Sequence, residues 1–333
     1  MVSLLDVSRP RGAAQVLLAL AFVAFATCGM SARAAELKEL RIDFATYNPV
    51  SLVLKEQGLL EKEFAAKGIE IRWVQSLGSN KALEFLNASS LDFGSTAGSA
   101  ALIARINGNP IKAIYDYSGA EWTALVTRKD SGIKTVADLR GKRIAVPRGT
   151  DPHVFLVRAL AKAGLSEKDV KLVLLQHGDG RAALDRGDVD AWAGLDPIMA
   201  AAEIENGDIL FYRDRSANSG GFLNVRESFA QEHPEAVREV LAAYEAARLW
   251  ALAHPAELRA LVTKVTKLPP EVVARQLDER TDLSNSVIGD AQRQSVLDAG
   301  LALREAGVLP ASTDVKAALD GLIDRRFRAA SVK

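Results

Sequence analysis

Residues 143–153 read RIAVPRGTDPH, and the apolar residues of the stretch that follows, VFLVRALAKAGL (154–165), recur at helical spacing. The run RIAV predicts a short strand, and the apolar periodicity after it predicts a helix. Between the two lies the turn PRGT (147–150), which is built from residue types that favour turns. A strand-to-helix turn of this polar composition is typical of a place where a protein holds another group.

The same order of strand and helix patterns occurs twice in the chain. Short β-branched or apolar runs alternate with amphipathic helical segments over residues 40–117, and the series begins again after Gly141. An ordinary α/β chain also alternates strands with helices, so the sustained register is what favours an internal duplication. The offset slides only from about 102 to about 98 residues, and it matches Arg41 with Arg143, Gln75 with Gln176, and Asp92 with Asp190.

This duplication predicts an α/β protein of two lobes, each a mainly parallel sheet flanked by helices. The chain would cross between the lobes near residues 122–132 and return through residues 220–228. From Phe229 onward the pattern is helical, with Pro234 and Pro255 at expected helix starts, and this tail should pack back onto lobe one. The predicted parts are a signal peptide at 1–34, the first part of lobe one at 35–125, lobe two at 126–222, and the return to lobe one with the C-terminal helices at 223–333.

Composition and charge narrow the class of protein. Of 333 residues, 48% are hydrophobic and 25% are charged, so the chain can bury a substantial core. The formal net charge is zero and no run of Lys or Arg stands out, which argues against nucleic acid as a partner.

The N-terminal segment predicts export. Arg9 and Arg11 precede an apolar run at residues 13–27, which is shorter than the ~20 residues of a membrane span, and the small residues at 32–34 predict signal-peptidase cleavage after Ala34. Cys28, the only cysteine, lies inside this segment, and Thr27 before it fits a lipoprotein signal poorly. We therefore expect a periplasmic protein without a lipid anchor or a disulfide.

Polar turns follow the predicted strands of both lobes, at the end where open α/β sheets bind ligands. Helix starts expose unpaired N–H groups and a positive dipole end, so a cleft between two such edges would suit a small anion. The alternative is plain helix capping, for which Ser, Thr and Asp are the preferred residues. The turns concerned are at residues 46–49, 76–80, 94–99, 147–153, 177–180 and 192–197.

Several side chains in these turns are candidate ligand contacts. Hydroxyls would donate hydrogen bonds, Gly149 would allow close backbone approach, and Arg148 would add positive charge if it turns inward. Trp122 and Trp192 would stack on the organic part of a ligand, or else serve as core aromatics. The hydroxyl-bearing candidates are Ser95, Thr96, Ser99 and Thr150.

Enzyme and metal signatures have little support in this sequence. Only four histidines occur, and no HExxH, GxxxxGK[ST] or GxSxG motif is found, so we expect no metal, no cofactor and no catalysis. His153 would be a general base near Thr150 in an enzyme, but a polar cap or ligand contact is the better interpretation.

The sequence resembles the substrate-binding proteins of ABC importers for sulfonates, nitrate and taurine, and it is most similar to the aliphatic sulfonate binders. The likeness runs from Leu40 to about Pro310, and the order and spacing of its motifs carry it. These motifs are DFGSTAGSAAL (92–102), IKTVADLRGKRIAVPRGTDPH (133–153), LVRALAKAGL (156–165), GRAALDRGDVDAWAGLDP (180–197) and the helical stretch 229–257.

The resemblance implies a two-lobed type II periplasmic binding protein fold with a helical C-terminal tail. It also implies a monomer that closes over one small organic anion and docks on an ABC permease and its ATPase at the inner membrane. In such proteins the turns matching Ser95-Thr96 and Gly149-Thr150 hold the anion. The residues matching Asn48, beside Tyr47, and Trp192 complete the cleft, and Asp196 orients its wall.

Three places depart from the family pattern and leave the ligand open. They are the turn Tyr47-Asn48-Pro49, the pair Asp151-Pro152 where a carboxylate would repel an anion unless it points away or caps the helix, and Ile198-Met199. One alternative keeps the fold and binds nitrate, taurine, a sulfate ester, an aromatic acid or a thiamine-precursor pyrimidine. Another is a secreted enzyme on the same scaffold.

Overall fold

The computed structural model describes residues 37–327 of the chain. The predicted signal peptide and Cys28 lie outside the described residues. Within the described range, no helix is both long enough and apolar enough to pass through a bilayer.

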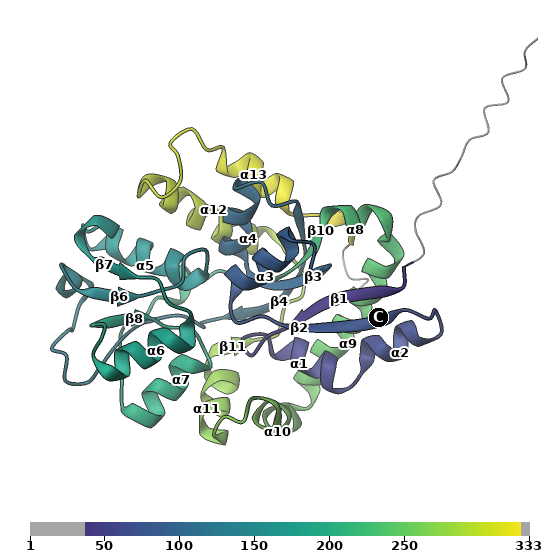
Figure 1. Ribbon diagram of the computed structural model, residues 1–333, viewed down its shortest axis with the longest axis horizontal. Helices are drawn as coiled ribbons and strands as arrows, with labels where there is room; N and C mark the ends of the chain where they lie inside the picture. Colours follow the sequence, from purple (N-terminus) through teal and green to yellow (C-terminus); the bar gives the residue numbers. More distant parts are fainter. Residues whose placement is uncertain (1–36, 328–333) are drawn as a thin grey trace, which may run out of the picture. The chain divides into compact units, whose positions relative to one another are not determined.

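The first sheet forms around β1, in which Leu40 and Ile42 are fully buried. Strand β1 pairs in parallel with both β2 and β3, whereas β10 lies antiparallel between β3 and β4 (Figure 1). The strand order is β11-β4-β10-β3-β1-β2. The strands are β1 (Glu39–Phe44), β2 (Glu70–Gln75), β3 (Phe93–Ala97), β4 (Ile111–Ala120), β10 (Gly221–Arg226) and β11 (Thr281–Asp282).

The helices of this lobe come from both ends of the chain. Proline opens α1, α9, α10 and α11, where its missing N–H leaves no helical hydrogen bond unmade. The expected helix starts at Pro234 and Pro255 are therefore confirmed. The helices are α1 (Pro49–Glu56), α2 (Leu59–Ala65), α3 (Ser79–Asn87), α4 (Gly98–Ile106), α8 (Glu227–Glu232), α9 (Pro234–Ala253), α10 (Pro255–Thr266), α11 (Pro270–Ala274), α12 (Asp290–Glu305) and α13 (Val315–Leu322).

The second sheet lies within residues 125–212 and has the order β7-β6-β8-β5-β9. Strand β6, from the opening stretch RIAV, pairs in parallel with β7 and β8. The elements of this lobe are β5 (Leu125–Thr127), β6 (Arg143–Ala145), α5 (Asp151–Lys162), β7 (Lys171–Val173), α6 (His177–Arg186), β8 (Ala191–Ala193), α7 (Ile198–Ala201) and β9 (Ile209–Tyr212).

Both sheets are mainly parallel, as expected, and each also contains at least one strand that runs in the opposite direction. Strand β5 is antiparallel to β8 and β9, just as β10 is antiparallel to β3 and β4. The parallel strands of each lobe end at the cleft between the lobes. A strand that enters a lobe from the other one starts at the cleft, so it runs in the opposite direction.

The residues matched by the internal repeat make the same ion pair in both lobes. The backbone N–H of Arg41 donates to Asp92 Oδ2 at 2.9 Å, and its Nη2 donates to Oδ1 at 2.8 Å. In lobe two the N–H of Arg143 donates to Asp190 Oδ2 at 2.8 Å, and its Nη2 donates to Oδ1 at 3.0 Å. The matched Arg and Asp residues therefore join a central strand to the residues just before its parallel neighbour in each lobe.

The C-terminal helices pack onto lobe one, as expected, and they also contact lobe two. Tyr244 of α9 is fully buried in the core of the first sheet. Helix α12 packs on α5 through a separate apolar cluster, in which Val154 and Val157 contact Ala299 and Leu303. The second lobe keeps its own apolar clusters on the two faces of its sheet.

Candidate ligand-binding cleft

A small cavity lies where the parallel strands of the two sheets end. Its volume is about 10 Å³, roughly the space of one water molecule, so the two lobes are closed together here. Three of the predicted contacts line it, namely Tyr47, Trp122 and Thr150. The remaining lining residues are Ser79, Ala97, Asp151, Pro152, His177 and Leu195.

The N-termini of α3, α4, α5 and α6 meet at the wall of this cavity. Ser79, Asp151 and His177 are the first residues of α3, α5 and α6, and Ala97 precedes α4. In the described chain, none of these helices has a hydrogen bond from its N-cap side chain to its first turn. Their first amides have no acceptor within the helix, and their dipoles point positive ends at the cavity. In α4 the first two amides already donate, Gly98 N–H to the carbonyl of Gly220 and Ser99 N–H to Ser219 Oγ. This arrangement favours a negatively charged group.

The carboxyl group of Asp151 accepts hydrogen bonds from several residues of the cleft. Ser99 Oγ donates to Asp151 Oδ1 at 2.5 Å, and Trp122 Nε1 donates to Oδ2 at 2.8 Å. The amide and hydroxyl of Ser219 donate to the same carboxylate at 3.1 and 2.7 Å. Burial raises the pKa of Asp151, while these hydrogen bonds favour its ionised form. Ser99 and Trp122, predicted as ligand contacts, thus bind the Asp151 carboxyl group, which joins α4 and both crossing segments to α5.

The other predicted hydroxyls also donate within the protein. Ser95 Oγ donates to Asp43 Oδ1 at 2.9 Å, and Thr96 Oγ1 donates to the carbonyl of Ala97 at 3.0 Å. Thr150 Oγ1 donates to the carbonyl of Pro147 at 2.8 Å. A hydroxyl has one proton, so in this conformation these side chains have none left for a ligand. Of the three, only Thr150 lines the cavity.

Tyr47 and Asn48 build the lobe-one side of the cleft. The Tyr47 ring lines the cavity, and its hydroxyl donates to the carbonyl of Ser95 at 3.0 Å. Asn48 is fully buried behind the wall, where it caps α1 by accepting from the amide of Ser51 and donates to Ser95 Oγ at 2.8 Å. Its role in the structure is to hold the end of β3 in place.

Two of the predicted ligand contacts, Arg148 and His153, do not line the cavity. Arg148 is exposed and does not turn inward, because it pairs with Glu167 at 3.5 Å. His153 Nε2 lies 2.6 Å from Glu167 Oε1, and this hydrogen bond, with help from Arg148, lowers the pKa of Glu167. Gly149 has a φ of 74°, which favours glycine, and a Cβ there would lie 3.9 Å from Asn80 Cβ of lobe one.

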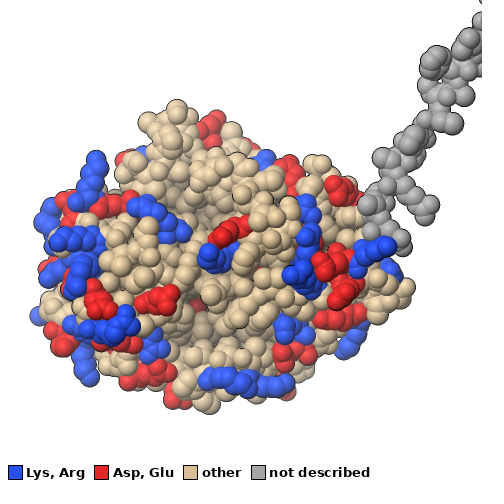
Figure 2. Space-filling view, in the orientation of Figure 1, with Lys and Arg blue, Asp and Glu red and all other residues tan. Residues whose placement is uncertain are grey.

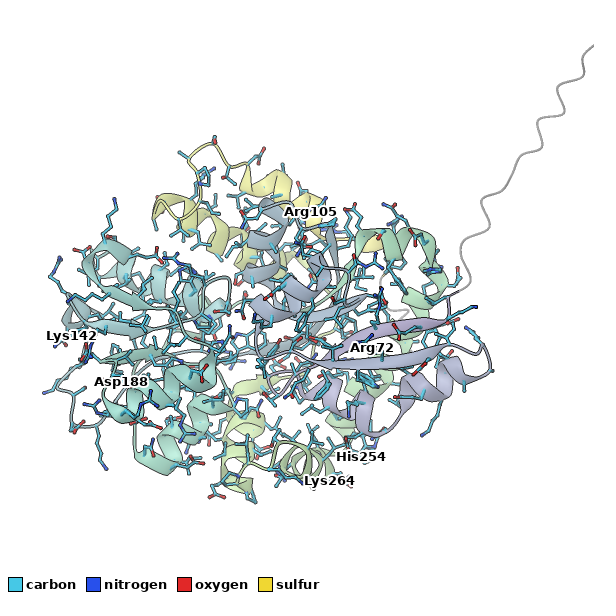
Figure 3. All side chains as sticks on the ribbon, in the orientation of Figure 1. Arg72, Arg105, Lys142, Asp188, His254 and Lys264 are labelled. Carbon is cyan, nitrogen blue, oxygen red and sulfur yellow. The ribbon has the colours of Figure 1, made fainter. Side chains whose placement is uncertain are left out.

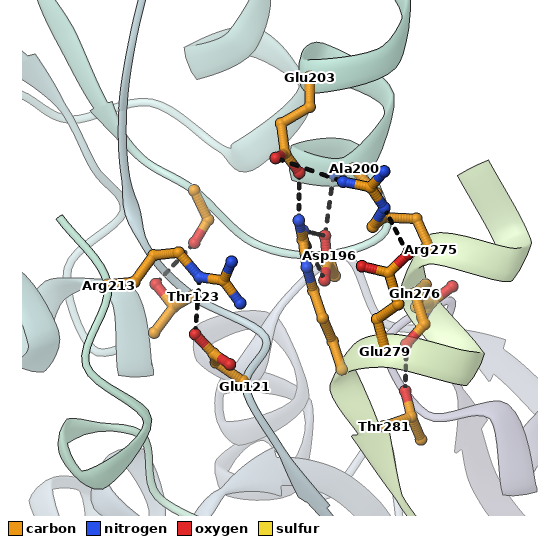
Figure 4. Close-up of polar contacts among 12 residues, drawn as sticks. Glu121, Thr123, Asp196, Ala200, Glu203, Arg213, Arg275, Gln276, Glu279 and Thr281 are labelled. Carbon is orange, nitrogen blue, oxygen red and sulfur yellow. Dashed lines mark hydrogen bonds and ion pairs between the residues drawn. The ribbon is translucent and has the colours of Figure 1, made fainter. Parts of the chain in front are cut away.

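Asp196 takes part in a buried ion network between lobe two and the C-terminal region (Figure 4). It accepts from Arg280 Nη1 at 3.1 Å and from the amide of Ala200 at 2.9 Å. Arg280 also pairs with Glu203, which Arg275 approaches from the other side. Burial raises the pKa of Asp196 to about 6, although Arg280 opposes this effect. No local sequence signal marks Arg280, because it lies outside the repeated segments.

His177 is the cavity residue that sequence reasoning missed. The turn HGDG that contains it was among the expected cleft turns, but the histidine itself was not a candidate. Its ring lines the cavity and the residue is 1% exposed. Burial lowers its pKa to about 3, so the imidazole is neutral. The ring of Trp192 is fully buried behind it, with the two ring centres 6.5 Å apart.

Charge lies mainly outside the cleft. Lys and Arg are interspersed with Asp and Glu over the face in Figure 2, and side chains such as Lys142 and Asp188 lie at the edge of the molecule in Figure 3. The described residues that line the cavity include Asp151 but neither Lys nor Arg. Across residues 37–327, no three His, Cys, Asp or Glu side chains are placed to share a metal ion. An anion in this cavity would therefore be held by amides, dipoles and neutral side chains.

Known proteins resemble the chain over most of its length. A Bacillus subtilis (strain 168) protein named for binding aliphatic sulfonates is 31% identical over 281 residues, covering 83% of this chain and 84% of that protein. An Escherichia coli (strain K12) protein with the same name is 32% identical over 247 residues, covering 72% and 76%.

The fold and the family follow from two further comparisons. The alkanesulfonate-binding protein from Xanthomonas axonopodis pv. citri, solved bound to MOPS, superposes with a TM-score of 0.78 at 29% identity, covering 86% of this chain and 99% of that one. The model of the family described as NMT1/THI5 like matches residues 61–258, which is more than half of the chain. The chain belongs to the NMT1/THI5-like family, with the fold of a periplasmic binding protein.

Proposed function

We propose that the protein is an extracytoplasmic solute-binding protein that closes its two lobes over a small organic anion, an aliphatic sulfonate, and delivers it to an ABC permease. The observation that carries this proposal is the meeting of the N-termini of α3, α4, α5 and α6 at one cavity. Two of these helices belong to each lobe, so an anion between them would stabilise the closed state.

The cavity lining supports an anion with an apolar tail. Tyr47, Trp122, Leu195 and Ala97 present carbon surface, whereas the helix starts supply N–H groups. An alkyl chain would displace water from the carbon surface, and a sulfonate would accept hydrogen bonds from the amides without needing a cationic partner.

The relatives support the same ligand class and the same location. The two curated relatives are named for aliphatic sulfonates, and the solved neighbour is an alkanesulfonate-binding protein. We propose that the present protein works in the periplasm as a monomer, with a permease and its ATPase as partners and without catalysis.

A ligand series tests the proposal. Purified protein lacking residues 1–34 would be titrated with methanesulfonate, butanesulfonate, hexanesulfonate, taurine, nitrate and sulfate, by thermal shift and calorimetry. A ligand at 100 times its Kd stabilises the protein by about 2.7 kcal/mol, so alkanesulfonates should raise Tm clearly. Mass spectrometry should recover the ligand unchanged. Failure of every sulfonate to bind, or turnover of one, contradicts the proposal.

A cavity-filling variant tests the location of the site. Ala97→Leu places extra carbon in the cavity and should weaken sulfonate binding at least about tenfold. Ala317→Leu makes the same change on the exposed face of α13 and serves as the control. Unchanged affinity in folded Ala97→Leu would place the ligand elsewhere.

A further inference from the structure

His177 has no hydrogen-bond partner on either side of its ring within residues 37–327. Both Nδ1 and Nε2 are shielded from solvent, and the residue is 1% exposed. It differs in this from His153, the other buried histidine of lobe two, which is paired with Glu167. A buried polar group without a partner costs stability, and most proteins avoid it unless another molecule completes the hydrogen bond.

Two polar atoms close to His177 also lack hydrogen-bond partners within the described residues. Asn80 Oδ1 and Trp192 Nε1 are also buried without a hydrogen-bond partner in the described chain. A Cβ atom on Gly78 would lie 3.0 Å from Asn80 Oδ1 and 3.5 Å from His177 Nε2, so the start of α3 and the start of α6 approach each other there. The unpartnered atoms thus belong to both lobes and gather beside the cavity.

We infer that His177 is a specificity-determining ligand contact, whose neutral imidazole donates a hydrogen bond to an oxygen of the bound anion's head group. This inference rests on the proposed function and names a residue that would recognise the head group of the ligand. The ring belongs to the first turn of α6, so the helix amides and the imidazole N–H can act on the same oxygens.

The chemistry favours a fully ionised oxyanion. A neutral imidazole offers one N–H donor, and the helix starts offer only further donors. A sulfonate presents three acceptor oxygens and no proton, so it can satisfy several of these donors at once. Asp151 lines the same cavity, but its carboxyl oxygens are acceptors that already have their donors, so they offer an anion no hydrogen bond. The head group should therefore bind at the His177 end of the cavity.

Substitutions at His177 separate a ligand contact from a packing role. His177→Leu removes both ring nitrogens and keeps an apolar side chain, whereas His177→Gln retains a donor. Butanesulfonate affinity, measured by calorimetry, should fall about 10–100-fold in His177→Leu and less in His177→Gln, because a hydrogen bond to a charged group is lost. Stability of the ligand-free protein should stay equal or rise in His177→Leu, since an unpaired polar group has been removed.

A spectroscopic measurement covers the case in which a variant folds poorly. In wild-type protein labelled with ¹⁵N-histidine, saturation with butanesulfonate should shift the ring nitrogens of one neutral imidazole. His254 precedes α10 and does not line the cavity (Figure 3), so His254→Leu should leave that shift and the affinity unchanged.

The outcomes distinguish this inference from the proposed function. If wild-type protein binds butanesulfonate but His177→Leu binds it equally well, or if no imidazole resonance shifts, the inference is wrong and the proposed function stands. If wild-type protein binds no sulfonate, both fail together. A loss of stability in His177→Leu with unchanged affinity would make His177 a packing residue only.

Discussion

The two lobes make the same Arg–Asp contact in different surroundings. In lobe one, the Asp92 side chain is 1% exposed and also accepts from Arg226 Nη2 at 2.8 Å. In lobe two, the Asp190 side chain is 30% exposed and pairs with Arg143. The residues that close over Asp92 come from β10, the strand that returns from lobe two. The same local contact therefore stabilises the two lobes to different extents, because segments outside the repeat bury it in one lobe and leave it exposed in the other.

The two lobes also differ in the size of the residue at one equivalent strand position. The strand position held by Gly94 in β3 corresponds to Trp192 in β8. In lobe one, Leu86 of α3 lies over Gly94, where a Cβ would be 2.9 Å from its Cδ1. In lobe two the indole lies under Gly180 of α6, where a Cβ would be 3.0 Å from its ring. Each lobe fills the helix–sheet space, but only lobe two does so with a ring that backs a cavity residue.

Of the variants that test this difference between the lobes, Trp192→Ala should lose the most unfolding free energy. Removing a fully buried indole leaves a cavity under α6 and should cost about 4 kcal/mol of unfolding free energy. Leu86→Ala in lobe one should cost about 3 kcal/mol. Urea unfolding measures both losses, and sulfonate affinity should fall only in Trp192→Ala, because His177 loses its support. Equal affinities in the two variants would refute this asymmetry.

The next largest effect should be the difference in stability loss between Asp92→Ala and Asp190→Ala. The first variant leaves Arg41 and Arg226 without their buried carboxylate and should cost about 3 kcal/mol. The second opens a solvent-exposed pair and should cost about 1 kcal/mol or less. Denaturant midpoints of both variants provide the measurement. Similar losses would mean that burial by β10 adds nothing to the pair.

Asp43→Asn should change the pH dependence of stability. Asp43 lies in β1 where lobe two has Ala145, and burial raises its pKa from the ordinary aspartate value of 3.8 to about 6. Between these values the folded protein binds more protons than the unfolded one, so this contribution is present at low pH and is lost as pH rises through 6. It should amount to about 2 kcal/mol between pH 4 and 7.

Thermal unfolding across that pH range would measure the contribution as a difference in slope. The decline with rising pH should be smaller in Asp43→Asn than in the wild type. Asp190→Asn is the control of opposite sign, because Arg143 lowers the pKa of Asp190, whose contribution is lost on acidification. Parallel profiles for wild type and Asp43→Asn would show that Asp43 does not titrate in this range.

Gly180→Ala should give the smallest effect. The added Cβ would lie 3.0 Å from the Trp192 ring and 3.3 Å from Ala145 Cβ, and the strain is partly offset by the better helix propensity of Ala. A net loss of about 1 kcal/mol is expected. Gly178→Ala in the same helix meets no atom within 4 Å and should be neutral or stabilising. Calorimetric Tm values for the pair would show whether the close packing matters.

Much of the fold was predictable because it depends on local periodicity and on an internal repeat. The Arg41–Asp92 and Arg143–Asp190 contacts were marked by matched register, and the turns that meet at the cavity were marked by their composition. The antiparallel strands β5 and β10 were not predicted, since their direction depends on where the chain crosses between lobes.

The sequence predicted where the candidate site lies better than it predicted which residues line it. Tyr47, Trp122 and Thr150 line the cavity, but Ser95, Thr96 and Asn48 support β3 instead, and Arg148 lies outside. Asp196 meets Arg280, which is 84 residues away in the sequence. Residue type identifies a possible donor, but it does not say which acceptor the donor will meet.

The amino-acid order by itself determined the two α/β lobes, the strand-to-helix turns and the pairing of Arg with Asp, because these depend on neighbours a few residues away or on a register repeated along the chain. Only the tertiary structure decided that Asp151 would bind Ser99, Trp122 and Ser219, and that His177 would be buried without a partner. The physical reason is that the availability of a hydrogen-bonding group depends on which distant groups folding brings within about 3 Å of it.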